Sequence, residues 1–135
     1  MAEQHHLEFH WLKDGPYAIM RFSPDAPVPE WAAKGEFTSI TRTAEELSIV
    51  CPAANLPREV SSQHRWICLK LQGPFPFSMT GVLLSFIEPL SSRGIPIFAI
   101  STFDTDYVLI QEEFMGVTLS ILDEAGHKLG PPHEF

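Results

Sequence analysis

The chain has 135 residues, of which 44% are hydrophobic and 19% are charged, and its net charge is −8. Such values describe a globular protein that can bury one core, or two small halves that share one core. Because the net charge is negative and the Lys and Arg residues are scattered, we expect no binding to nucleic acid or to a membrane.

Nothing in the sequence indicates export or membrane insertion. No apolar run reaches the roughly 18 residues of a membrane span. The amino terminus, with Glu3 and two histidines, lacks the basic and then apolar layout of a signal peptide. We therefore expect a cytoplasmic protein. Cys51 and Cys68 lie in apolar strand-like runs, where a free thiol serves as a small hydrophobic side chain, and a disulfide is the less favoured alternative.

Alternating apolar residues predict four strands in the first half of the chain. They span residues 7–12, 17–22, 36–41 and 47–51. The turn Asp14-Gly15-Pro16 separates the first two strands. Frequent prolines restrict helix in this half to a turn or two around residues 30–34.

The second half begins with a predicted strand at residues 66–71. Apolar residues at helical spacing then predict a one-faced helix from Thr80 to Leu90. Ser78 or Thr80 can cap its start, and Gly94 suits a left-handed residue at its end.

Two more strands, around a short polar turn, are predicted within residues 94–110. A second helix follows over residues 112–125, with two acids in its first turn and Gly126 at its end. Because each helix has one apolar face, we expect both helices to cover the same face of one sheet.

A weak internal repeat relates the two halves. Residues 40–50 align with residues 100–110, so that Ile40 matches Ile100 and Glu46 matches Asp106. We interpret the pattern as two related halves, the first abbreviated and the second complete. Chance similarity between two hairpins is the alternative.

The strand at 66–71, the helix start at 78–87 and a hairpin containing Ile100-Ser101-Thr102-Phe103 followed by an acidic pair occur in this order. Together they resemble the ACT domain, a small regulatory fold that usually binds amino acids. The resemblance covers residues 37–125 and is closest to small bacterial proteins related to the eukaryotic cytosolic arginine sensors. It implies an α+β, ferredoxin-like βαββαβ fold with two ACT-like halves, the first abbreviated, packed as one compact unit. The domains are then an N-terminal half at 1–60, a C-terminal half at 61–128 and a tail at 129–135.

ACT domains that bind amino acids generally place the ligand at the loop between the first strand and the first helix, here residues 73–81. Unpaired N–H groups at the helix start can bind a carboxylate without a basic side chain. Gly81 lets a ligand approach the backbone. The usual family pattern in this loop is an acid, a variable residue and Pro-Gly, whereas this chain has Ser78-Met79-Thr80-Gly81. A helix start without a ligand is the alternative.

The hairpin supplies acceptors for an α-ammonium group. In the arginine-sensing relatives a Thr-Phe pair and an aspartate three positions after the Phe contact the ligand, which implies the same roles here. The predicted ligand-binding residues are Met79, Thr80, Gly81, Val82, Thr102, Phe103 and Asp106. Asp104 is interpreted as a turn residue. The acidic pair would also suit a cationic amino acid, unless one carboxylate binds the α-ammonium group.

The sequence contains no recognisable catalytic or cofactor motif. His6 and His10 have a spacing that could bind a metal on a helix, but their segment alternates like a strand, so we expect exposed histidines and no metal or cofactor. We therefore expect a non-catalytic, amino-acid-binding sensor that forms a homodimer. The alternative is a protein–protein interaction or scaffold protein with a vestigial ligand site.

Overall fold

The computed structural model describes residues 5–130, which form two compact units with separate hydrophobic cores. Asp14–Trp66 is the inserted unit; the larger unit combines the described residues before Asp14 with those from Ile67 on. From the sequence we expected one compact unit, with the first residues in the N-terminal half. Each unit instead encloses its own core, and the first strand contributes Phe9 to the core of the larger unit.

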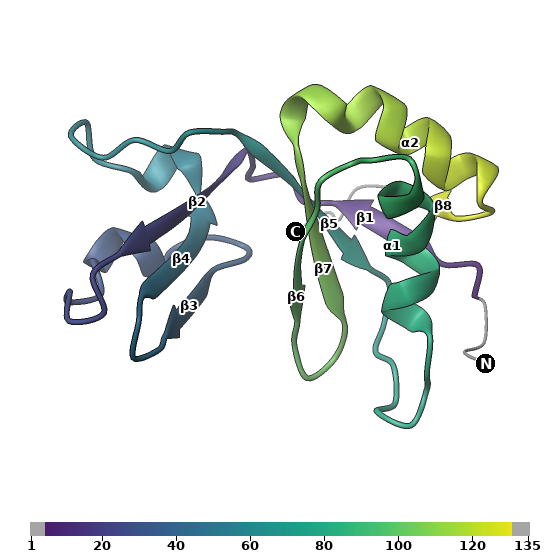
Figure 1. Cartoon of the computed structure of the whole chain (residues 1–135), viewed down its shortest axis with the longest axis horizontal. Helices are drawn as coiled ribbons and strands as arrows, with labels where there is room; N and C mark the ends of the chain where they lie inside the picture. The colour runs from purple at the N-terminus through teal and green to yellow at the C-terminus, as the bar shows by residue number, and fades with distance from the viewer. Residues whose placement is uncertain (1–4, 131–135) are drawn as a thin grey trace. The chain divides into compact units, whose positions relative to one another are not determined.

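The larger unit has mixed α+β structure (Figure 1). Its elements in chain order are β1 (Glu8–Trp11), β5 (Trp66–Leu71), α1 (Val82–Ser92), β6 (Phe98–Ser101), β7 (Asp106–Gln111), η3 (Glu112–Phe114), α2 (Met115–Glu124) and β8 (Lys128–Leu129). From β5 to β8 this is the βαββαβ succession, which confirms the predicted ferredoxin-like fold. The predicted tail begins inside β8, and its residues 131–135 lie outside the described part of the chain.

The N-terminal strand lies inside the sheet of the larger unit, whose strand order is β8-β1-β5-β7-β6. β1 is antiparallel to β5, with Phe9 opposite Leu71, and parallel to β8, with Phe9 also opposite Leu129. β1 therefore separates the first and last strands of the βαββαβ succession. Alternation in the sequence predicts this strand but does not identify its neighbours.

Both helices cover one face of the sheet, as expected. Alternate residues of β5 and β7 form one core with the buried faces of α1 and α2 (Figure 1). Phe86 of α1 is fully buried, and its ring meets that of Phe9 edge to face at a centroid distance of 5.2 Å. Gly94 and Gly126 follow the two helices with positive φ angles, as the sequence predicted.

His127 compensates for a proline within α1. Pro89 has no N–H group to donate to the carbonyl of Ser85, four residues earlier. The Nε2 atom of His127 lies 2.9 Å from that oxygen, and its Nδ1 accepts the N–H of Leu7 at 3.0 Å. Donation from Nε2 and acceptance at Nδ1 require a neutral imidazole. Burial lowers the pKa of His127, which agrees with this state.

The inserted unit is a three-stranded antiparallel arrangement in the order β3-β4-β2. Its elements are β2 (Tyr17–Phe22), η1 (Glu30–Ala33), β3 (Ser39–Arg42), β4 (Leu47–Pro52) and η2 (Ala53–Asn55). Its core includes alternate residues of β2 and β4 and fully buried Ala32 from η1. The short η1 stands where the complete half has the long helix α1, so the first half is abbreviated, as predicted.

The hairpins of the two units share one geometry. Their turns, 43–46 and 102–105, have equal length and begin with a threonine. The N–H of Thr43 donates to Glu46 at 2.9 Å, and the N–H of Thr102 donates to Thr105 at 2.8 Å. Ile40 therefore corresponds to Ala99, so the sequence alignment of Ile40 with Ile100 was wrong by one position.

Candidate ligand site

The β5–α1 loop, residues 72–81, lies against the β6–β7 turn, residues 102–105 (Figure 1). The N–H of Phe75 donates to the carbonyl of Asp104 at 2.9 Å. The hydroxyl of buried Thr105 donates to the carbonyl of Leu71 at 2.8 Å. A Cβ atom on Gly73 would lie only 2.9 Å from the oxygen of Asp104, so glycine permits this close approach. The two predicted parts of the ligand site are thus adjacent.

The start of α1 leaves its first-turn N–H groups without a side-chain cap. The predicted cap from Ser78 or Thr80 was wrong, because Gly81 is the N-cap residue, with a φ of 78°. The carbonyl of Gly81 accepts hydrogen bonds from the N–H and the hydroxyl of Ser85, at 2.9 and 2.6 Å. The adjacent Val82 is buried in the core, so only its backbone can face a ligand.

The remaining predicted residues of the loop are exposed, and part of their backbone is already hydrogen-bonded. The N–H of Met79 donates to the carbonyl of Pro76 at 3.0 Å, which closes a turn. The carbonyl of Thr80 lies 2.9 Å from Nε2 of His5. The N–H of Met79 is therefore already engaged, whereas the helix start keeps first-turn N–H groups without a side-chain cap.

The β6–β7 turn is fixed by Thr102. Its hydroxyl lies 3.1 Å from the carbonyl of Thr105, and the N–H of Thr105 lies 3.4 Å from the same hydroxyl. Directly after the turn, Asp106 pairs with Ser101 across the hairpin and accepts a hydrogen bond from its hydroxyl. Asp106 is half-buried at the start of β7, where one oxygen of its carboxylate is held by Ser101.

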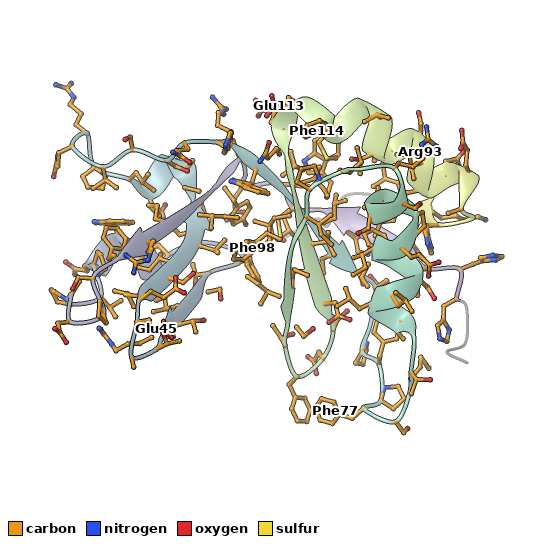
Figure 2. All side chains as sticks on the ribbon, in the orientation of Figure 1. Glu45, Phe77, Arg93, Phe98, Glu113 and Phe114 are labelled. Carbon is orange, nitrogen blue, oxygen red and sulfur yellow. The ribbon has the colours of Figure 1, made fainter. Side chains whose placement is uncertain are left out.

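An exposed aromatic pair joins the ends of the loop and the turn. The rings of Phe77 and Phe103 meet edge to face at 4.8 Å, although the two residues are 75% and 79% exposed. Figure 2 shows Phe77 at the end of its loop, directed toward the hairpin. Phe103 was predicted from the sequence and Phe77 was not, although the aromatic residues of Phe75-Pro76-Phe77 were an available signal.

The N-terminal histidines His5 and His10 have different hydrogen-bond partners. His10 is buried and hydrogen-bonded to Gln72, so the expectation that it is exposed was wrong. His5 lies beside the β5–α1 loop, and its N–H donates to the hydroxyl of Ser85 at 3.0 Å. Within residues 5–130, no group of three potential metal ligands of the His, Cys, Asp and Glu types is present. Over the same residues, no helix is long and apolar enough to cross a membrane.

Cys51 and Cys68 are buried, and they form no disulfide within residues 5–130. Burial raises the pKa of Cys51 to about 11, so its thiol stays protonated at neutral pH. This agrees with the expected role of both cysteines as small hydrophobic side chains.

Comparisons with known protein families and solved structures support the fold described above. The family model of the ACT domain matches residues 61–124, and a model of an N-terminal domain matches residues 15–59. The crystal structure of protein Atu0741 from Agobacterium tumefaciens superposes with a TM-score of 0.85 at 42% identity, covering 97% of this chain and 99% of that one. Protein VC0802 from Vibrio cholerae, at 18% identity, shares the fold with a TM-score of 0.70 over 89% and 90% of the two chains.

Among curated proteins, human CASTOR3P is 31% identical over 88 residues, which are 56% of this chain and 54% of that protein. The chain thus spans about half the length of this relative. The matches cover both halves of the chain, and they show that it contains an ACT domain at residues 61–124 and is related to CASTOR3P.

Proposed function

We propose that the chain is a non-catalytic cytoplasmic sensor that binds an amino acid between the β5–α1 loop and the β6–β7 turn. The observation that carries this proposal is an uncapped helix start at the end of a loop that is hydrogen-bonded to the β6–β7 turn, directly before the carboxylate of Asp106. The hydrogen bond from Phe75 to Asp104 holds the two parts together before any ligand arrives. A site that is already assembled loses less conformational entropy on binding.

In this proposal the two charged groups of the amino acid bind at opposite sides of the site. The α-carboxylate binds the first-turn N–H groups of α1, where the helix dipole favours negative charge. The α-ammonium group donates to the carboxylate of Asp106 and to the carbonyls of Thr102 and Phe103. Met79, Thr80, Gly81 and Val82 supply the backbone of the carboxylate side.

The side chain of the ligand would lie near the acidic turn and the aromatic pair. Asp104 is exposed on the turn and carries a negative charge that the α-ammonium group does not require. The faces of Phe77 and Phe103 attract cations as well as apolar groups. Both features favour a cationic amino acid such as arginine or lysine.

A thermal-shift screen of the standard amino acids tests the proposal. A ligand at about one hundred times its dissociation constant should stabilise the protein by about 2.7 kcal/mol, which raises the melting temperature measurably. We expect one amino acid, or one chemical group of them, to produce the shift, whereas its decarboxylated amine should not. Equal shifts with both compounds would contradict binding through the α-carboxylate.

The exposed aromatic pair also supports the second candidate function, a protein–protein interaction at a vestigial ligand site. In this alternative the partner is a second copy of the chain, since ACT domains commonly associate with one another. Phe77→Ser and Phe103→Ser together should then change the molecular mass in light scattering without affecting amino-acid binding. If the pair flanks the ligand instead, the same double variant weakens amino-acid binding and leaves the mass unchanged.

A further inference from the structure

We propose that the inserted unit contains a second binding site, which takes a small organic carboxylate. A cavity of about 390 Å³ lies between residues 19–22 of β2 and residues 60–66, which lead into β5. This volume falls within the range of small-molecule sites. No residue of the proposed amino-acid site lines the cavity, so the two proposals stand independently.

The cavity lies along one edge of β2. On the other edge β2 pairs with β4 over its whole length, from Tyr17 opposite Pro52 to Phe22 opposite Leu47. Toward β5, the described pairing of β2 is limited to Tyr17 opposite Trp66. Beyond this pair, the edge of β2 faces an irregular segment instead of a strand. Backbone groups along such an edge are available to a ligand.

Contacts at both ends of segment 60–66 keep the cavity open. Val60 packs against the core of the inserted unit, and its N–H donates to the carbonyl of Pro57 at 3.0 Å. At the other end, Trp66 is held by its pairing with Tyr17. Between these ends, the hydroxyl of Ser62 donates to the carbonyl of His64 at 2.9 Å. The segment is therefore ordered by contacts that leave the cavity volume unfilled.

The chemistry of the lining selects an anion. Arg21 is the only Lys, Arg, Asp or Glu among the described residues that line the cavity, although the chain has 17 acidic residues. One NH2 group of Arg21 donates to the carbonyl of Glu45 at 2.9 Å. A guanidinium has five N–H donors, so those that remain can bind a carboxylate, with two parallel hydrogen bonds in the best geometry.

The rest of the lining suits an apolar or flat group attached to the carboxylate. Ile19 and Phe22 contribute apolar surface from β2. The rings of His64 and Trp66 stand nearly perpendicular, at 89°, with centroids 6.3 Å apart. Aromatic walls of this kind bind planar groups through stacking and edge contacts. An aromatic or short aliphatic carboxylate satisfies both parts of the lining.

The test is a titration of the full-length, ¹⁵N-labelled protein, followed through its backbone amide resonances. The probes are acetate, succinate, phenylacetate and indole-3-acetate at constant ionic strength, each compared with its neutral amide. We expect at least one carboxylate to shift the resonances of residues 19–22 and 60–66, and its amide to bind at least about tenfold more weakly.

Two exposed arginines provide the matched variants. Arg21→Gln should weaken carboxylate binding at least about tenfold, whereas Arg58→Gln, which removes the same charge outside the lining, should leave it unchanged. The amide spectrum of each variant reports whether it is folded. The proposal is overturned if no carboxylate shifts these resonances, if the amides bind equally well, or if both variants weaken binding to the same extent.

Discussion

His127 connects three segments of the larger unit through one neutral imidazole. It bonds the backbone of Leu7 before β1 and that of Ser85 in α1, and its own residue lies between α2 and β8. Its ring also contacts Phe86, at a centroid distance of 5.3 Å. Nothing in the sequence relates His127 to the carbonyl of Ser85, which Pro89 leaves without its usual helical partner.

We predict that this contact makes the free energy of unfolding depend on pH. Burial lowers the pKa of His127 in the folded state, so the unfolded state binds more protons as the pH falls below about 6.5. The contribution of neutral His127 to the free energy of unfolding is complete above a pH of about 6.5. It is lost as the pH decreases toward the lowered pKa of the folded state. Urea denaturation at a series of pH values from neutral to mildly acidic measures this loss.

His127→Ala should destabilise the protein at neutral pH by about 2 kcal/mol, since it removes the ring that bonds the buried N–H of Leu7 and the partly buried carbonyl of Ser85. It should also reduce the pH dependence. The control is His64→Ala, an exposed histidine in the inserted unit, which should change neither quantity appreciably. An unaltered pH dependence in His127→Ala would contradict the assignment.

A substitution of Asp106 distinguishes the proposed sensor function from the scaffold alternative. Asp106→Asn retains an oxygen that can accept the hydroxyl of Ser101, so we expect folding stability to change little. The loss of charge should weaken amino-acid binding by about ten- to a hundredfold. Calorimetric titration measures the affinity, with Asp123→Asn, at an exposed position of α2, as the matched control. A marked fall in melting temperature without a change in affinity would instead assign Asp106 a structural role.

At the scale of the elements, the sequence predicted what local patterns determine and missed what tertiary contacts determine. β2 and β5 occupy the predicted residues because their apolar runs are bounded by turn residues. α1 begins at Val82 instead of Thr80, because Gly81 adopts a left-handed conformation. The neighbours of β1 were not predictable, since alternation reports which face is buried and not which strand lies beside it.

The candidate site was also predictable only in part, because local patterns do not report the tertiary contacts that bring its parts together. The loop and the turn were chosen from a family resemblance, and the structure places them side by side through Phe75, Gly73 and Thr105. Ser85 and His5 reach the start of α1 from positions that no local pattern relates to it. Phe77 was missed because an exposed aromatic residue in a loop carries no periodic signal.

The two helix-terminal glycines of α1 provide a prediction at this scale. Gly81 and Gly94 have nearly equal φ angles, 78° and 77°. Asn tolerates this conformation, whereas a β-branched residue does not. Gly81→Asn and Gly94→Asn should therefore cost similar, small amounts of stability. Only Gly81→Asn should weaken amino-acid binding, by about tenfold or more, because its side chain enters the space next to the helix start.

Equal affinities in calorimetric titration of the two folded variants would remove the helix start from the site. Gly94 is suitable as the control because a Cβ atom there would meet nothing within 4 Å.

At the scale of the whole molecule, the inserted unit interrupts the larger one between neighbouring strands. The chain leaves the larger unit after β1 and returns to it in β5. At this point the N–H of Leu12 donates to the carbonyl of Cys68 at 3.0 Å. Both ends of the insertion are thus anchored in one antiparallel pair. The predicted boundary at residue 60 separates two related halves of the sequence. The compact units divide the chain differently, because the inserted unit is Asp14–Trp66.

We predict that residues 14–66 do not fold when produced alone. The fragment is shorter than the roughly 60 residues at which burial becomes marginal, and its long helix is replaced by the short η1. Circular dichroism of the fragment should show an unfolded chain, with no cooperative thermal transition. A soluble fragment with the strand signal and a sharp transition would show that the inserted unit is an independent domain.

Binding of an amino acid between the β5–α1 loop and the β6–β7 turn can be tested directly. The most direct measurement is a titration of the ¹⁵N-labelled full-length protein with the amino acid that gives the largest thermal shift. We expect saturable changes in the amide resonances of residues 79–82 and 102–106, which in Asp106→Asn should require about ten- to a hundredfold more ligand. Saturable changes confined to other residues, or no saturable change with any standard amino acid, would contradict this proposal.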